Sequence, residues 1–386
     1  MNEKDTVKIS VFGDFAPVQR FNDYRFKESL FCDGLKETIS SSDLSVVNVE
    51  APLTNRGVPI HKTGPNLRAD PLFAETLRAA GVDVAGLANN HIRDFGDEGV
   101  IDTIDVCREA GLDVVGAGRN LEEATRVLFK EIKGVKISII AVAEREFSIA
   151  SSVSAGAAPL DVIEVARTLR RCQQSTDICI VLLHGGNEYF PLPRPKLREA
   201  ARFFVESGAS AVICSHTHLP SAFEWYEGAF ISYGLGNLIF DHLNPPEGWN
   251  EGYGVELSIS HNKRALQDAV VVPYQQGYSL KGARRLGREE QENFMTRLKE
   301  ENNNLLDCYR YNLAWRSFCE GRSRYLMANF LTPLSFRGLS RLWRIRVFRR
   351  IFQGDLAKKM ARQNLIQCPS HREVIEFCLD EETKGN

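Results

Sequence analysis

The stretch Ala211-Val-Ile-Cys-Ser-His-Thr-His218 guides the interpretation of the whole chain. Its apolar, β-branched residues predict a strand that ends in two histidines with one residue between them. Because side chains alternate along a strand and the turn that follows it, His216 and His218 can project to the same side. Two neutral imidazoles on one side form half of a metal site, and Zn, Fe, Mn and Ni all accept imidazole. Taken alone, the pair is equally well explained as two polar residues that close a strand.

Four further predicted strands also end in residues that can bind a metal. These candidates are Asp14 after strand 7–12, Glu50 at the end of strand 44–50, Asn90-His91 after strand 82–88 and His184 after strand 177–183. In open α/β sheets, ligands bind beyond the carboxyl ends of the strands, so one sheet edge would gather these side chains. Each residue alone has an ordinary explanation, such as a turn, a helix cap or a buried core histidine. Together they predict oxygen and nitrogen ligands, which suit Mn, Fe or Zn.

The alternation of strands with helical patterns predicts an α/β fold. The helices are expected at 72–80, 97–110, 161–171 and 196–207, and the small polar segment 148–159 is expected to be a loop. Such alternation indicates a sheet that is at least partly parallel, with helices on both faces. The pattern changes near residue 276, where a polar helix over 281–304 begins the rest of the chain. We therefore predict two parts, 1–275 and a helical, arginine-rich extension over 276–386.

Composition indicates a globular protein without a strong charge bias. Hydrophobic residues make up 43% and charged residues 25% of the 386 residues, and the net charge is −2. We therefore expect no nucleic-acid partner. The nine cysteines form no CxxC pair, which disfavours a structural zinc knuckle and fits a reducing compartment. The polar start and the absence of a long apolar run predict a cytoplasmic protein, or one held peripherally at a membrane.

The segment 322–354 contains eight arginines, no acidic residue and many interleaved apolar side chains. One interpretation is a helix that packs on the rest of the protein through its arginine stems and apolar residues. The other is an interfacial or partner-binding helix. The sequence leaves both open.

The order and spacing of these motifs resemble the calcineurin-like metallophosphoesterase superfamily. Within it they are most similar to the branch named for the capsule and poly-γ-glutamate biosynthesis protein CapA. The segments that carry the resemblance are Gly13-Asp14, Asn48-Val-Glu50-Ala-Pro52, Ala88-Asn-Asn90-His91 with Asp94, His184-Gly-Gly-Asn-Glu188, His216-Thr-His218 and Gly234-Leu-Gly-Asn237. The resemblance spans about residues 6–275. It implies a layered metallophosphoesterase-like sheet core with flanking helices, followed by the helical C-terminal extension.

The resemblance also implies roles for individual residues. One or two divalent ions (Mn, Fe or Zn) would be held by Asp14, Glu50, Asn90, His184, His216 and His218, with Glu50 at the bridging position. His91 would act as the general acid, oriented by Asp94. We assign Lys62, Arg68 and Glu188 to binding of an anionic substrate.

Three positions depart from the pattern of the family. Ala16 stands where phosphoesterases usually carry a histidine, so one metal position loses a ligand. Ser215 replaces the glycine that usually precedes the paired histidines. His184-Gly-Gly replaces the usual His-Trp-Gly of the branch, which predicts a wider pocket at Gly185.

The resemblance implies a metal-dependent hydrolase in the synthesis of capsule, poly-γ-glutamate or another cell-surface polymer. A metal-activated water would attack a phosphoryl or acyl centre of an anionic substrate or polymer. The alternative is a non-catalytic metal-binding component of a polymer synthesis or export complex, with residues 322–354 docking on a membrane-bound enzyme. Ala16 favours the alternative, whereas the retained Asp14, Asn90 and histidine pair favour the enzyme.

Overall fold

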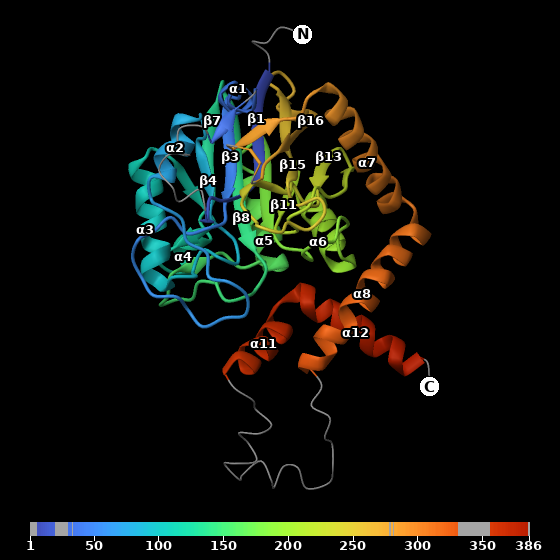
Figure 1. The fold of residues 1–386 in the computed structure, drawn as a ribbon. Coiled ribbons are helices and arrows are strands. Elements are labelled where there is room, and N and C mark those ends of the chain that lie inside the picture. Colours follow the sequence, from blue (N-terminus) through green and yellow to red (C-terminus); the bar gives the residue numbers. More distant parts are fainter. Residues whose placement is uncertain are drawn as a thin grey trace.

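Two β-sheets packed face to face form the centre of the molecule, with helices around them (Figure 1). The computed structural model of the chain describes residues 6–19, 30–32, 34–277, 279–280, 282–330 and 356–384. Within these residues the predicted α/β class is confirmed. The strands that carry the candidate ligands lie in the parallel parts of both sheets, as the alternating pattern predicts.

The larger sheet has nine strands, of which four neighbouring ones are parallel. The parallel strands are β1 (Thr6–Ala16), β3 (Leu44–Val49), β4 (Val84–Gly86) and β5 (Asp113–Val115). The sheet continues beyond β1 through β15 (Glu251–Ser260), β16 (Ala265–Gln275), β17 (Ala283–Arg285) and β2 (Phe31–Cys32), and β14 (Asn237–Phe240) pairs with the end of β1. Because β17 belongs to this sheet, the predicted helix over 281–304 begins later, at Arg288.

The smaller sheet has six strands. Its order is β12 (Phe223–Tyr226), β13 (Ala229–Ser232), β11 (Ala211–Ser215), β10 (Ile178–His184), β8 (Val135–Ala143) and β7 (Leu128–Ile132). The neighbours from β13 to β8 are parallel. A third, two-stranded sheet joins β6 (Ala117–Gly118) to β9 (Gly156–Ala157). The prediction of a plain loop over 148–159 is therefore wrong, since β9 lies within it.

Both faces of the central strands of the smaller sheet (β8, β10, β11 and β13) are buried, which explains why these strands are apolar at almost every position. On β8, Ile139 faces the core between the two sheets, and the next residue, Ile140, faces the opposite side. That opposite side is covered by α5 (Val162–Cys172) and α6 (Pro195–Glu206). Helix α5 begins where Asp161 predicts it, because the Asp161 carboxylate accepts hydrogen bonds from the backbone N–H groups of Ile163 and Glu164.

The remaining helices lie around the sheets and below their edge in Figure 1. They are α1 (Leu35–Ser40), α2 (Phe73–Ala79), α3 (Gly96–Glu109), α4 (Leu121–Ala124), α7 (Arg288–Leu306), α8 (Cys308–Phe330), α11 (Leu356–Gln367) and α12 (Pro369–Lys384). In the part of the chain that the structure describes, no helix is both long enough and apolar enough to cross a membrane.

The C-terminal helices share the hydrophobic core of the first 275 residues. Phe294 and Leu298 of α7 join the cluster between the sheets. Trp315 of α8, Leu365 of α11 and Val374 of α12 join the cluster on the outer side of the smaller sheet. The division at residue 276 therefore stays a prediction. Residues 331–355, which make up most of the arginine-rich segment 322–354, lie outside the described residues.

Candidate metal centre

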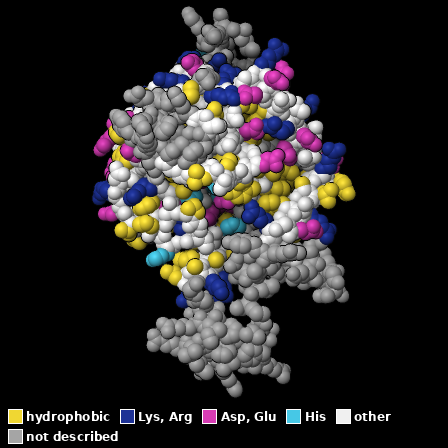
Figure 2. All heavy atoms as spheres, viewed as in Figure 1, with side chains coloured by type: hydrophobic (Ala, Val, Ile, Leu, Met, Phe, Trp, Pro, Cys, Tyr) yellow, Lys and Arg dark blue, Asp and Glu magenta, His cyan; other side chains and the backbone are white. Residues whose placement is uncertain are grey.

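The carboxyl ends of the strands bring the predicted metal ligands together, as expected for parallel neighbours. All six are buried: Asp14 on β1, Glu50 after β3, Asn90 after β4, His184 on β10, and His216 and His218 after β11. Figure 2 shows histidine and acidic side chains gathered in a hollow on one face of the molecule. The structure thus brings these six side chains together at one edge of the sheets.

Two groups of candidate ligands share the Glu50 carboxylate. Glu50, His184 and His216 form one group, and Asp14, Glu50 and His218 form the other, with the ligand atoms of each group within 4.8 Å of one another. The His184 Nε2 atom lies 3.8 Å from Glu50 Oε1. The Asn90 Oδ1 atom lies 3.0 Å from the same imidazole nitrogen, so Asn90 borders the first group.

Glu50 shows that this site fits a cation. Its side chain is fully buried, yet neither carboxylate oxygen has a hydrogen-bond partner among the described residues. Burial, together with the neighbouring Asp14 carboxylate, raises the pKa of Glu50 well above its usual range. An unpaired buried carboxylate is costly, whereas divalent cations held by the two groups would supply the positive charge that the Glu50 carboxylate lacks. Carboxylate, amide and imidazole donors suit Mn, Fe or Zn.

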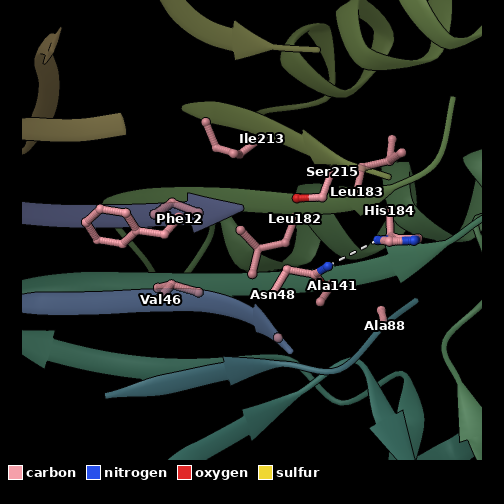
Figure 3. Close-up of a pocket in the computed structure, with 12 residues that line it drawn as sticks. Phe12, Val46, Asn48, Ala88, Ala141, Leu182, Leu183, His184, Ile213 and Ser215 are labelled. Atoms are coloured by element: carbon pink, nitrogen blue, oxygen red, sulfur yellow. Dashed lines mark hydrogen bonds between the residues drawn. The ribbon is translucent and has the colours of Figure 1, made fainter. Parts of the chain in front are cut away.

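Asn48 orients ligands of both groups. Its Nδ2 atom donates to Asp14 Oδ1 at 2.7 Å and lies 3.2 Å from His184 Nδ1. Figure 3 shows Asn48 and His184 meeting at one end of a small cavity of about 20 Å³, where the labelled neighbours are mostly apolar. Asn48 lies on β3, two residues before Glu50, and the period of two along the predicted strand 44–50 could have identified it.

The two histidines after β11 serve different groups. Both have left-handed backbone conformations, with φ values of 102° for His216 and 58° for His218, which are rare for residues other than glycine. The His216 N–H donates to Asp14 Oδ2 at 3.1 Å, and His218 Nδ1 lies 3.0 Å from Asn237 Oδ1. Although burial opposes a charge, Glu50 and Asp14 raise the pKa of His218 to about 10. The strained turn therefore directs one imidazole to each group.

His91 and Asp94 form the predicted pair. His91 Nδ1 lies 2.6 Å from Asp94 Oδ2, so the neutral imidazole donates from Nδ1 and presents an unprotonated Nε2. Lys62 forms an ion pair with Asp94, and its Nζ atom lies 3.0 Å from His91 Nδ1. Burial and the Lys62 charge lower the pKa of His91 despite Asp94.

The predicted substrate-binding residues lie in different places. Lys62 and Glu188 line a cavity of about 310 Å³ beside the centre, together with His91. The Lys62 side chain is only 4% exposed and already paired with Asp94. Although burial opposes ionisation, the imidazoles of His218 and His216 hold the pKa of Glu188 below its usual value. Arg68 is not part of this cavity: it is exposed and lies 4.6 Å above the Phe95 ring.

Glu144 and Glu146 follow strand β8, and the sequence analysis assigned neither of them a role. Glu146 Oε1 lies 4.0 Å from His216 Nε2, and burial followed by the Glu188 charge raises the pKa of Glu146 to about 8. Glu144 explains why residue 185 is a glycine, because a Cβ at position 185 would lie 2.6 Å from the Cγ atom of Glu144. The expected widening of the pocket at Gly185 is therefore wrong, since Glu144 fills that space.

A family model and two relatives that match this chain are described as proteins of capsule or PGA synthesis. A family described as "Bacterial capsule synthesis protein PGA_cap" matches residues 8–242, which end before β15 and the C-terminal helices. The capsule biosynthesis protein CapA of Bacillus anthracis is 28% identical over 221 residues, 55% of this chain and 53% of that protein. The chain thus spans about half the length of that relative. The PGA biosynthesis protein CapA of Bacillus subtilis (strain 168) is 27% identical over 268 residues, 67% of this chain and 69% of that protein.

A solved structure titled as a novel phosphatase from Mycoplasma pneumoniae is also similar. It matches 74% of this chain and 96% of its own at 14% identity, with a TM-score of 0.43.

Proposed function

Because the chain belongs to the bacterial capsule synthesis protein PGA_cap family, we propose that it is a metal-dependent hydrolase in the synthesis of capsule, poly-γ-glutamate or another cell-surface polymer. The observation that carries the proposal is the Glu50 carboxylate, which is buried, unpaired and shared by two groups of ligands. A shared carboxylate between two ions is the arrangement that hydrolases with two metals use.

The two groups would hold the ions as follows. Asp14, Glu50 and His218 would hold one, and Glu50, His184 and His216, with Asn90 beside them, would hold the other. Divalent ions bound there would polarise a phosphoryl or acyl group and activate a water molecule as the nucleophile. Asn48 keeps Asp14 and His184 in place through its amide nitrogen.

His91 is the residue we assign to proton transfer. Asp94 fixes the tautomer of the imidazole through Nδ1, so Nε2 is the atom that exchanges a proton with the reacting group. Lys62 forms an ion pair with Asp94, and this contact holds the carboxylate beside the imidazole and the imidazole in one orientation. Lys62 therefore positions His91 and Asp94, in addition to lining the cavity.

Metal analysis combined with two chromogenic substrates tests the proposal. We expect at least one divalent transition metal per chain in the wild type and its loss in the double variant His216→Ala, His218→Ala. The matched control His261→Ala changes an exposed histidine on the turn between β15 and β16 and should keep the metal. Hydrolysis of p-nitrophenyl phosphate or of γ-glutamyl-p-nitroanilide then distinguishes an ester from an amide substrate. A folded protein that cannot be loaded with metal would contradict the proposal.

The second candidate function is a non-catalytic metal-binding component of a polymer synthesis or export complex. Ala16 supports it, because the Asp14 group has one side chain fewer than the family pattern provides. In a strain that depends on this protein for polymer synthesis, His91→Gln separates the two functions. Polymer synthesis at the wild-type level by a metal-loaded His91→Gln protein would favour the non-catalytic component.

A further inference from the structure

The cavity beside the metal centre has one wall that comes from the C-terminal helices. Its floor includes Asn90, His91, Glu188 and His216. The opposite wall, which we name the roof, consists of Phe318, Arg322, Asn364, Leu365, His371 and Val374 from α8, α11 and α12. In Figure 1 these helices lie below the edge of the sheets. All roof residues lie beyond residue 242, where the family match ends.

A buried network fixes the roof to the core. Arg194, before α6, donates to Glu144 at 2.6 Å and to Ser370 at 3.2 Å, and it forms an ion pair with Glu373 of α12. Ser370 also donates to Glu144. Because Glu144 follows β8, the first turn of α12 is held against the strand beside the metal centre. The lack of a side chain at Gly185 leaves room for the Glu144 carboxylate.

Polar atoms around the cavity lack partners within the described residues. The Oδ1 atoms of Asn187 and Asn364 are unpaired, although these residues are only 6% and 7% exposed. The Nδ1 atom of His371 is also buried and unpaired. All three residues line the cavity. Buried polar groups in folded proteins are usually hydrogen-bonded, so these atoms are available to a bound molecule.

Arg322 supplies the positive charge of the roof. Its guanidinium lies 5.7 Å from the Tyr189 ring and 5.6 Å from the Phe318 ring, and it donates to the Glu188 backbone oxygen at 3.3 Å. Among the described residues, the contacts that hold Arg322 include no carboxylate. Guanidinium binds carboxylate and phosphate oxygens in a bidentate manner, and aromatic faces orient its plane. The roof therefore offers an anion-binding group opposite the metal centre.

We propose that the roof is a second substrate subsite, in which Arg322 binds a carboxylate or phosphate group of the substrate. The amide oxygens of Asn187 and Asn364 accept hydrogen bonds from N–H or O–H groups of the same molecule. The subsite rests on the proposed function: it would bind one unit of an anionic chain while the bond next to that unit lies at the metal centre. The cavity, at about 310 Å³, is at the lower end of the range for small-ligand pockets, so it holds one or two units of a polymer.

Binding of two probes to the full chain tests the subsite. Calorimetry with γ-linked hexaglutamate and with inorganic phosphate distinguishes a carboxylate from a phosphate ligand. We expect Arg322→Ala to weaken binding of the preferred probe at least tenfold, and Arg322→Lys to weaken it less. The matched control Arg316→Ala removes an arginine of the same helix that pairs with Glu320 at 3.0 Å on the exposed side, and it should change binding less than twofold.

Asn364 provides a second variant that does not alter charge. Asn364→Ala should weaken binding about threefold or more, whereas Gln363→Ala, whose exposed side chain pairs with Gln367, should not. If Arg322→Ala does not fold, Arg322→Lys and Asn364→Ala decide the question. Wild-type binding of both probes by these variants would overturn the subsite, and so would a wild-type protein that binds neither probe.

The outcomes separate the subsite from the proposed function. A protein that binds hexaglutamate through Arg322 but hydrolyses nothing, with or without metal, supports the subsite and contradicts the hydrolase. A metal-dependent hydrolase in which Arg322→Ala leaves KM and kcat for an anionic oligomer unchanged contradicts the subsite alone. A rise of KM with kcat retained is the expected result for lost uniform binding.

Discussion

Replacing Arg194 with methionine should detach the roof from the core. Arg194 is the only cation in the described network that joins Glu144, Ser370 and Glu373, and its side chain is 4% exposed. Although burial opposes ionisation, Arg194 and Ser370 hold the pKa of Glu144 below its usual value. The methionine side chain has nearly the same length but leaves two buried carboxylates without a cation.

The loss of stability expected for Arg194→Met follows from the burial of the two carboxylates that Arg194 pairs with. Glu144 and Glu373 are 4% and 9% exposed, so solvent screens the pairs very little. Removal of one partner from a buried ion pair costs about 3–5 kcal/mol, whereas an exposed pair contributes less than about 1 kcal/mol. We therefore expect Arg194→Met to lower the free energy of unfolding by about 3–5 kcal/mol. The control Arg316→Ala breaks an exposed pair with Glu320 and should cost less than about 1 kcal/mol.

Urea unfolding and hydrogen exchange give separate measurements of this effect. Faster exchange confined to α11 and α12 would indicate that the roof opens while the sheets stay folded. Adding Glu144→Gln and Glu373→Gln to Arg194→Met should recover part of the loss, because the neutral amides need no cation. A loss below about 1 kcal/mol, with exchange of α12 unchanged, would refute the role of the network.

Four further predictions follow from single features. Glu50→Gln should abolish metal binding, because an amide cannot replace the carboxylate that both groups of candidate ligands share. A chelator should therefore lower the Tm of the wild type and leave that of Glu50→Gln unchanged. His91→Gln should keep the metal, measured by elemental analysis, and lower kcat about 10²- to 10⁴-fold. Although burial opposes ionisation, Arg202 and Tyr233 hold the pKa of Glu224 in the folded protein below its usual value. The ionised Glu224 therefore contributes its full stability above the pKa of the unfolded chain, and this contribution is lost as the pH falls through the lower pKa of the folded protein. Glu224→Gln should reduce the loss of stability measured in acid unfolding. Truncation after residue 276 tests the predicted division: a folded, metal-binding fragment supports it, and an insoluble fragment shows that β17 and the C-terminal helices complete the core.

The positions of the candidate ligands were predictable because they follow one rule. Parallel strands present their carboxyl ends at one edge, so a residue that follows a predicted strand can be placed without knowing any long-range contact. Asp14, His184 and His216 were found in this way. Glu144 and Glu146 follow β8, whose residues 137–143 form an apolar run interrupted only by Ser138, so the same rule would have found them. They were missed because their neighbours in the sequence, Glu144-Arg145-Glu146, include no histidine.

The roof was not predictable from local pattern. The pairs that build it join residues far apart in the chain, such as Arg194 and Glu373, which are 179 positions apart. Neither residue lies in a motif, and an arginine before a helix usually contacts solvent. Periodicity identifies which face of α12 is apolar, but it does not say which surface that face covers. The sequence therefore predicted a helical extension and left its position open.

Gly185 shows why a missing side chain is a poor guide to open space. From the sequence, a glycine beside His184 predicts a wider pocket, because its side chain is removed from the substrate side. In the structure the space is occupied by Glu144, whose Cγ atom would lie 2.6 Å from a Cβ at position 185. The carboxylate that fills this space binds Arg194 and Ser370, and through them it holds α12 against the core. The glycine within the family match and the helices outside it are thus one feature: the space left at Gly185 accommodates the carboxylate that anchors the roof over the metal centre.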